Sequence, residues 1–98
     1  MTKKKIPYGA PIPVYFTEKE LELIREHAFF NEEFGKMALY ENGKKRLDLS
    51  LDDIEELHGF IAAEANHTQN KKLQNALDRI LVKLDRYFDR YDDQHDLP

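Results

Sequence analysis

The sequence predicts a mainly α-helical single domain with three helices, the second and third forming an antiparallel helical hairpin, plus a minor β-hairpin and an extended amino-terminal arm. Three segments support the helices, because each follows a residue that caps helices well and continues with apolar residues three or four positions apart. The dipeptide Asn42-Gly43 separates two short segments and is typical of a tight hairpin turn. Pro7, Pro11 and Pro13 disfavour a helix in the arm.

The composition indicates one ordered, cytoplasmic domain. A chain of 98 residues has room for one small core and not for a second domain. Its 41% apolar and 35% charged residues suit a folded chain in water. Cysteine is absent, which excludes disulfides, thiol catalysis and thiolate metal sites. No segment approaches the roughly 20 apolar residues that span a bilayer, so we expect no membrane association.

The arm, residues 1–16, is expected to be extended, with its apolar side chains lying on another surface. Thr17 and Glu20 then have the spacing of a capping box. They predict a first helix from Glu18 to about Phe29. Its inner face is formed by Leu21, Ile24 and Ala28.

The middle of the chain predicts a hairpin followed by a second helix. Residues 37–41 and 44–49 flank the turn at Asn42-Gly43. Ser50 is a good helix cap, and Asp52 and Asp53 follow in the first turn, where the positive end of the helix dipole favours carboxylates. This helix should end near residues 66–70. Its inward positions are Leu51, Ile54, Leu57, Ile61 and Ala65.

The third helix has the clearest pattern in the chain. Apolar and tyrosine residues recur at alternating spacings of four and three, as in a coiled-coil seam: Leu73, Leu77, Ile80, Leu84, Tyr87 and Tyr91. The short link to the preceding helix favours an antiparallel pair. We therefore place the helical domain at residues 17–92 and an acidic tail at residues 93–98.

The same helix predicts a protein interface. Its apolar face is wider than one neighbouring helix needs, and it is flanked by charges of both signs. Two interpretations remain open: an ordinary core face, or a contact in a homodimer or with another protein. The residues of the predicted interface are Leu77, Leu81, Leu84, Tyr87, Phe88 and Tyr91.

Two Glu-x-x-His pairs raise the question of a metal site. They are Glu55 with His58 and Glu64 with His67. The two histidines are nine residues apart, which corresponds to a rotation of about 900° along a helix, so the two imidazoles point to opposite sides and cannot bind one ion within one chain. A two-fold dimer could still join Glu64 and His67 to their symmetry mates. The favoured interpretation is a helix-to-helix turn capped by Thr68 or Asn70, with no cofactor.

The other polar features do not predict a catalyst. His58 lies near the apolar stripe and is expected to be half-buried and hydrogen-bonded. Ser50 is the only serine and is needed as a cap, and there is no glycine-rich phosphate loop, so we expect no enzyme activity. Lys44, Lys45 and Arg46 could contact the phosphates of a nucleic acid, or simply protect an exposed strand edge.

One resemblance supplements these patterns. The segment LSLDDIEELHGFIAAEANHT at residues 49–68, with the Lys-Lys-Leu-Gln that follows and with Arg25-Glu-His-Ala-Phe, resembles a family of small uncharacterised bacterial proteins. The resemblance covers about the central two-thirds of the chain and implies a bacterial, cytoplasmic protein of unknown function. Taken together, the sequence predicts a non-catalytic interaction module that self-associates, with a small nucleic-acid-associated regulator as the alternative.

Overall fold

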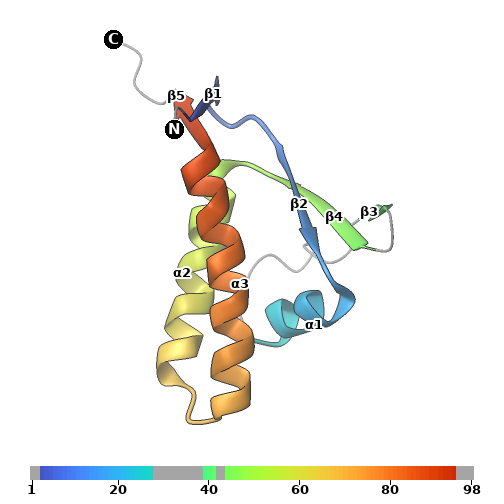
Figure 1. Cartoon of the computed structure of the whole chain (residues 1–98), viewed down its shortest axis with the longest axis vertical. Helices are drawn as coiled ribbons and strands as arrows, with labels where there is room; N and C mark the ends of the chain where they lie inside the picture. Colours follow the sequence, from blue (N-terminus) through green and yellow to red (C-terminus); the bar gives the residue numbers. More distant parts are fainter. Residues whose placement is uncertain (1–2, 28–38, 42–43, 95–98) are drawn as a thin grey trace.

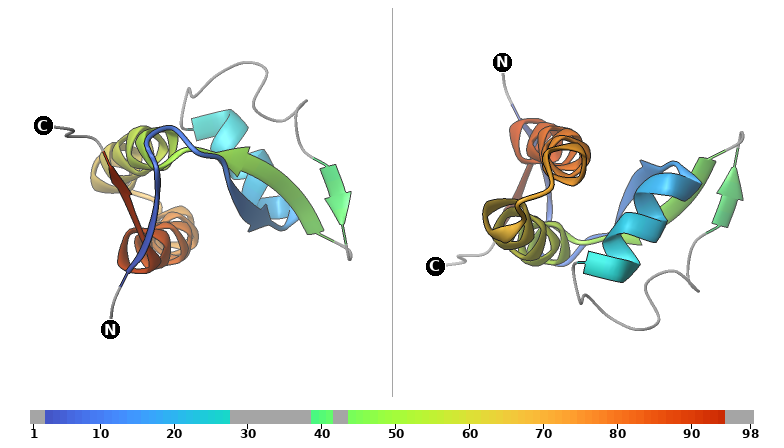
Figure 2. Two further views of the ribbon diagram at one scale, coloured as in Figure 1. Left: turned by 90° about the horizontal axis from the view of Figure 1, so that it is seen from above. Right: turned by 90° about the horizontal axis from the view of Figure 1, so that it is seen from below.

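The computed structural model describes residues 3–27, 39–41 and 44–94 and confirms the predicted fold class. Helices α2 (Leu51–His67) and α3 (Lys71–Arg90) lie side by side and antiparallel, as a helical hairpin (Figure 1). A small sheet extends to one side of this pair, and α1 (Glu18–His27) lies near the amino-terminal half of α3. Seen from above and below, the helix pair and the sheet with α1 form two adjoining groups (Figure 2).

The sheet has three antiparallel strands in the order β2-β4-β3, with bounds Ile12–Phe16, Lys44–Leu49 and Leu39–Glu41, respectively. The pairing of β3 with β4 confirms the predicted hairpin, while the turn at residues 42–43 lies outside the described residues. Val14 is opposite Leu47 in the register, and both are buried. Alternate side chains of a strand share a face, so β2 and β4 turn one apolar face to the helices.

The predicted arm is extended, but it is built into the fold. Strand β1 (Lys4–Pro7) pairs in parallel with β5 (Tyr91–Gln94), so the predicted tail also begins inside a strand. A turn over residues 7–10 connects β1 to β2, with Gly9 at a φ of 81° that favours glycine. The pairings were missed because each joins segments far apart in the sequence, which a local pattern does not reveal.

The first helix begins as predicted. The backbone N–H of Thr17 donates to Glu20 Oε1 at 2.8 Å, and the N–H of Glu20 donates to Thr17 Oγ1 at 3.1 Å. These two bonds are the reciprocal pair of a capping box. The predicted extension of this helix over Ala28 and Phe29 lies outside the described residues.

The caps of the hairpin helices settle where the chain turns. Ser50 and Asp53 form a capping box at the start of α2. Asn70 caps α3, because its Oδ1 accepts the backbone N–H groups of Lys72 at 3.0 Å and Leu73 at 3.2 Å. Thr68 instead accepts the N–H of Asn70 within the turn. The helix-to-helix turn predicted for this stretch is therefore confirmed.

One core joins all three helices and two strands. The predicted inward stripe of α2 is entirely buried, and so are the three central seam positions of α3. Helix α3 ends at Arg90, and Tyr91, the last residue of the predicted seam, begins β5. Across the described parts of the chain, no helix is long and apolar enough to cross a membrane. The buried set is Ile12, Val14, Phe16, Leu21, Ile24, Leu47, Leu49, Leu51, Ile54, Leu57, Ile61, Ala65, Leu77, Ile80 and Leu84.

Candidate functional site

The predicted interface on α3 contributes largely to the core of the chain itself. Leu77 and Leu84 have no exposed surface. A side chain without exposed surface cannot contact a second chain unless the fold opens, so these two residues belong to the core. The remaining four are partly buried and pack against it: Leu81, Tyr87, Phe88 and Tyr91. Contact of those four with a partner stays a prediction.

His58 connects the two hairpin helices. Its Nε2 lies 2.9 Å from Oδ1 of Asp85 on α3. Its ring meets the ring of Phe88 edge-on, with 5.8 Å between the centroids. The half-buried, hydrogen-bonded histidine predicted from the sequence is thus observed, and both of these contacts join α2 to α3.

Glu64 and His67, the weak candidates for a metal site, lie at the carboxyl end of α2. His67 is exposed and Glu64 is half-buried. Within the ranges that the structure describes, no group of three or more His, Cys, Asp or Glu side chains is arranged to hold a metal ion. A site shared between two copies stays a prediction.

Lys44, Lys45 and Arg46 follow one another along β4, where consecutive side chains point to opposite faces of the sheet. Lys44 is exposed, whereas Lys45 and Arg46 are half-buried, and Arg46 Nε lies 3.4 Å from Oδ1 of Asp48. The basic run is therefore divided between two faces. The lysines at residues 3–5 lie toward the other end of β2, because β1 leads into the end remote from Lys45 (Figure 1).

The outer edge of β2 is covered by α3. Lys83 Nζ donates to the carbonyl oxygen of Tyr15 at 3.1 Å. In a strand, every second residue directs its backbone N–H and C=O groups to the same edge. Two positions before Tyr15, the residue that faces this edge is Pro13, which has no N–H to donate. This edge is therefore blocked to a strand from another chain.

A carboxylate on α1 extends this contact. Glu20 Oε1, which caps α1, lies 2.6 Å from Lys83 Nζ, and the ammonium also lies 5.6 Å from the centroid of the Phe16 ring. The Glu20 side chain is 19% exposed, so water screens the pair less than it screens an ion pair at the open surface. The contact fixes the start of α1 beside α3.

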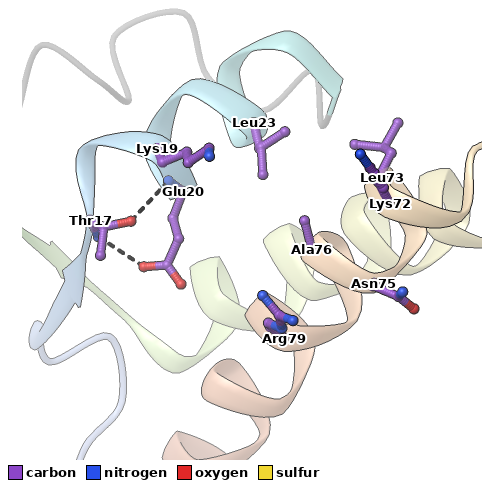
Figure 3. Close-up of a pocket in the computed structure, with 9 residues that line it drawn as sticks. All are labelled: Thr17, Lys19, Glu20, Leu23, Lys72, Leu73, Asn75, Ala76 and Arg79. Atoms are coloured by element: carbon purple, nitrogen blue, oxygen red, sulfur yellow. Dashed lines mark hydrogen bonds between the residues drawn. The ribbon is translucent and has the colours of Figure 1, made fainter.

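A hollow of about 650 Å³ lies between α1 and the first half of α3 (Figure 3). Leu23 and Ala76 point toward each other across it (Figure 3). We call it the α1–α3 groove and define it by two sets of lining residues. The half-buried apolar set is Leu23, Leu73 and Ala76, and the exposed cationic set is Lys19, Lys72 and Arg79.

The cations of the groove belong to a longer basic stripe. At about 100° per residue, five basic positions of α3 fall within about 60° of one another around the helix. All are exposed except Lys83, which is held by Glu20. The stripe consists of Lys72, Arg79, Lys83, Arg86 and Arg90.

The outer side of α2 has the opposite charge. The helix carries five carboxylates and no Lys or Arg, namely Asp52, Asp53, Glu55, Glu56 and Glu64. On its outer side a hollow of about 550 Å³ is lined by what we call the acidic face, defined as Asp52, Glu55, Glu56, Gly59 and Phe60. Phe60 keeps 39% of its surface exposed. This face therefore combines an aromatic side chain with surrounding negative charge.

Sequence reasoning missed both charged surfaces. The residues of the basic stripe follow one another at spacings of seven, four, three and four, and this pattern can be recognised in the sequence. The position of α1 beside α3, which completes the groove, cannot be recognised there, because it depends on tertiary contacts. We compared the chain with protein-family models, curated proteins and solved structures, and found no match in any of the three. The resemblance to small bacterial proteins therefore stays a prediction.

Proposed function

We propose that the protein is a non-catalytic protein–protein interaction module that self-associates. The observation that carries the proposal is the separation of charge between the two hairpin helices. The exposed side of α2 is acidic, whereas one face of α3 is basic, although the whole chain has a net charge of only −4. Complementary surfaces of this kind orient protein partners and raise their association rate.

The fold favours an association in which the surfaces of two folded copies meet. It does not favour one in which the copies exchange helices or strands of their cores. The central seam residues are already buried within one chain, and α3 covers the outer edge of β2. A second copy would therefore bind to the surface of a chain whose core is already formed. Such contacts between folded domains commonly have polar rims and depend on charge.

The solution mass tests this proposal. We expect light scattering to give the mass of one chain, 11.6 kDa, at low concentration and a larger mass as the concentration rises. Added salt should lower the larger mass, because exposed charges are screened over about 8 Å at physiological ionic strength. A constant monomer mass at every concentration would contradict the proposal. A larger mass that only a chelator reduces would instead favour the shared metal site of Glu64 and His67.

The second candidate is a small nucleic-acid-associated regulator. The basic stripe of α3 favours it more than the predicted hairpin tip does, because Lys44, Lys45 and Arg46 are divided between two faces. Binding through the stripe should weaken steeply with salt, as counterions return to the phosphates. Titration of a labelled DNA duplex, with Arg79→Gln compared against Lys45→Gln, would locate any such contact.

A further inference from the structure

We propose that self-association is head to tail: the acidic face of α2 on one copy docks into the α1–α3 groove of a second copy. This inference rests on the proposed function and specifies its surfaces.

The groove is suited to an acidic partner with an apolar side chain. Lys19, Lys72 and Arg79 are exposed around it, and the one carboxylate in its lining, Glu20, is already engaged by Lys83. The local charge is therefore positive. The lining also includes Leu23, Leu73 and Ala76, which are half-buried and leave apolar surface for an incoming side chain to cover.

Gly59 allows a partner to approach the acidic face closely. It lies in the middle of α2, where glycine costs about 1 kcal/mol relative to alanine. A Cβ atom built at this position would meet none of the described atoms within 4 Å. Its φ is also not in the left-handed region that favours glycine. Neither packing within the described fold nor backbone geometry therefore requires a glycine here, whereas close approach by another chain would.

The two surfaces are opposite in charge, and each includes apolar side chains. Phe60 is the large apolar residue of the acidic face and has Glu55 and Glu56 beside it, so it can enter the groove while these carboxylates meet the rim cations. The acidic face lies on the side of α2 opposite its buried residues, and the groove lies where α3 meets α1. Different surfaces therefore meet at each contact, which produces a ring or an open chain of copies.

Charge reversal at each surface tests the docking. In the groove variant, Lys72→Glu and Arg79→Glu are combined, and in the face variant, Glu55→Lys and Glu56→Lys are combined. We expect each variant alone to associate at least about tenfold more weakly than the wild-type chain, because like charges then oppose each other at the contact. An equimolar mixture of the two should recover association, since each supplies the charges that the other requires.

Two further variants separate docking from general effects. Arg86→Glu with Arg90→Glu reverses the same number of charges on the same stripe but outside the groove, and should change the dissociation constant less than about threefold. Gly59→Ala should raise the thermal midpoint of unfolding and yet weaken association. Damage to the fold would lower the midpoint, so it cannot produce this combination.

The outcomes distinguish the two proposals. A wild-type chain that stays monomeric at millimolar concentration overturns both of them. Association that persists in the groove and face variants, or that the Arg86 and Arg90 reversal weakens equally, overturns the docking and leaves self-association standing. Tighter binding of a short labelled DNA duplex than of a second copy, lost in the groove variant, would assign the groove to nucleic acid and overturn the docking.

Discussion

At the scale of single residues, Lys83 makes three contacts that no pattern in the sequence predicts. Its ammonium group binds the carbonyl of Tyr15 and the carboxylate of Glu20, and it lies over the ring of Phe16. These partners belong to β2 and α1, so one side chain of α3 holds two other elements. In the sequence, Lys83 is only one member of a basic stripe.

Replacing Lys83 by methionine should destabilise the fold by about 1–3 kcal/mol, because the part-buried Glu20 loses its cation while the alkyl packing is kept. The free energy of unfolding in urea is the measurement. Arg86→Met, at an exposed position of the same helix, is the matched control and should change it by less than about 0.5 kcal/mol. Equal losses in both variants would contradict the role assigned to Lys83.

Tyr87 should make the stability depend on alkaline pH. Burial raises the pKa of its hydroxyl above the ordinary value of 10.0, more than the hydrogen bond to Tyr15 and the charge of Arg90 lower it. The folded chain therefore holds this proton more tightly than the unfolded chain does. The resulting stabilisation is complete below pH 10 and is lost as the pH rises through the folded pKa.

The contribution of the Tyr87 hydroxyl is measured by how the free energy of unfolding changes with pH, because the substitution itself also changes the stability at every pH. We expect the free energy of unfolding of Tyr87→Phe to fall less steeply above pH 10 than that of the wild-type chain. The same substitution at Tyr91, the other tyrosine of the seam, provides the comparison. If the two variants show the same pH profile, the effect does not belong to Tyr87.

At the scale of elements, the sequence predicted what is local and missed what is distant. The capping box at Thr17, the helix cap at Ser50, the buried stripe of α2 and the hairpin of β3 with β4 were all predicted, because each depends on residues a few positions apart. Strands β1, β2 and β5 were not predicted, since their partners lie far along the chain. For the same reason, the basic stripe was readable from the sequence but the groove was not.

The start of α3 depends on a single cap. Its first turn contains Lys71 and Lys72 and no acidic residue, so no carboxylate there offsets the partial positive charge of the helix start. The side chain of Asn70 is the group that accepts the free N–H groups of this turn. We expect Asn70→Ala to cost about 0.5–2 kcal/mol and Asn70→Asp to be neutral or to stabilise by about 0.3–1 kcal/mol. Urea unfolding of both variants checks this, and a loss on Asn70→Asp as large as that on Asn70→Ala would contradict it.

At the scale of the whole molecule, the described helices and the sheet pack around one hydrophobic core. Helices, sheet and arm share the same cluster of buried side chains. The surface of the chain, in contrast, is divided into an acidic side on α2 and a basic side on α3. The buried core residues therefore differ from the residues of the two charged sides, although Lys83 of the basic stripe also holds β2 and α1 in place.

A single core predicts a single unfolding transition. Leu84→Ala should cost about 2–5 kcal/mol and lower the stability of helices and sheet together, because Leu84 is completely buried. Val82→Ala, at a position 54% exposed on the same helix, should cost less than about 0.5 kcal/mol. Coincident melting curves from far-ultraviolet circular dichroism and tyrosine fluorescence would support this. Two separated transitions in the Leu84 variant would show that the sheet and the helix pair unfold independently.

The parallel pairing of β1 with β5 also determines an order of events in time. Lys4 is opposite Tyr91, so this pair closes a loop of almost the whole chain, whereas α2 and α3 are joined by only residues 68–70. Closing a long loop costs more conformational entropy than closing a short one, and contacts between distant segments form late in folding. We therefore expect the helical hairpin to nucleate folding and the two terminal strands to join last, and to separate first when the chain begins to unfold.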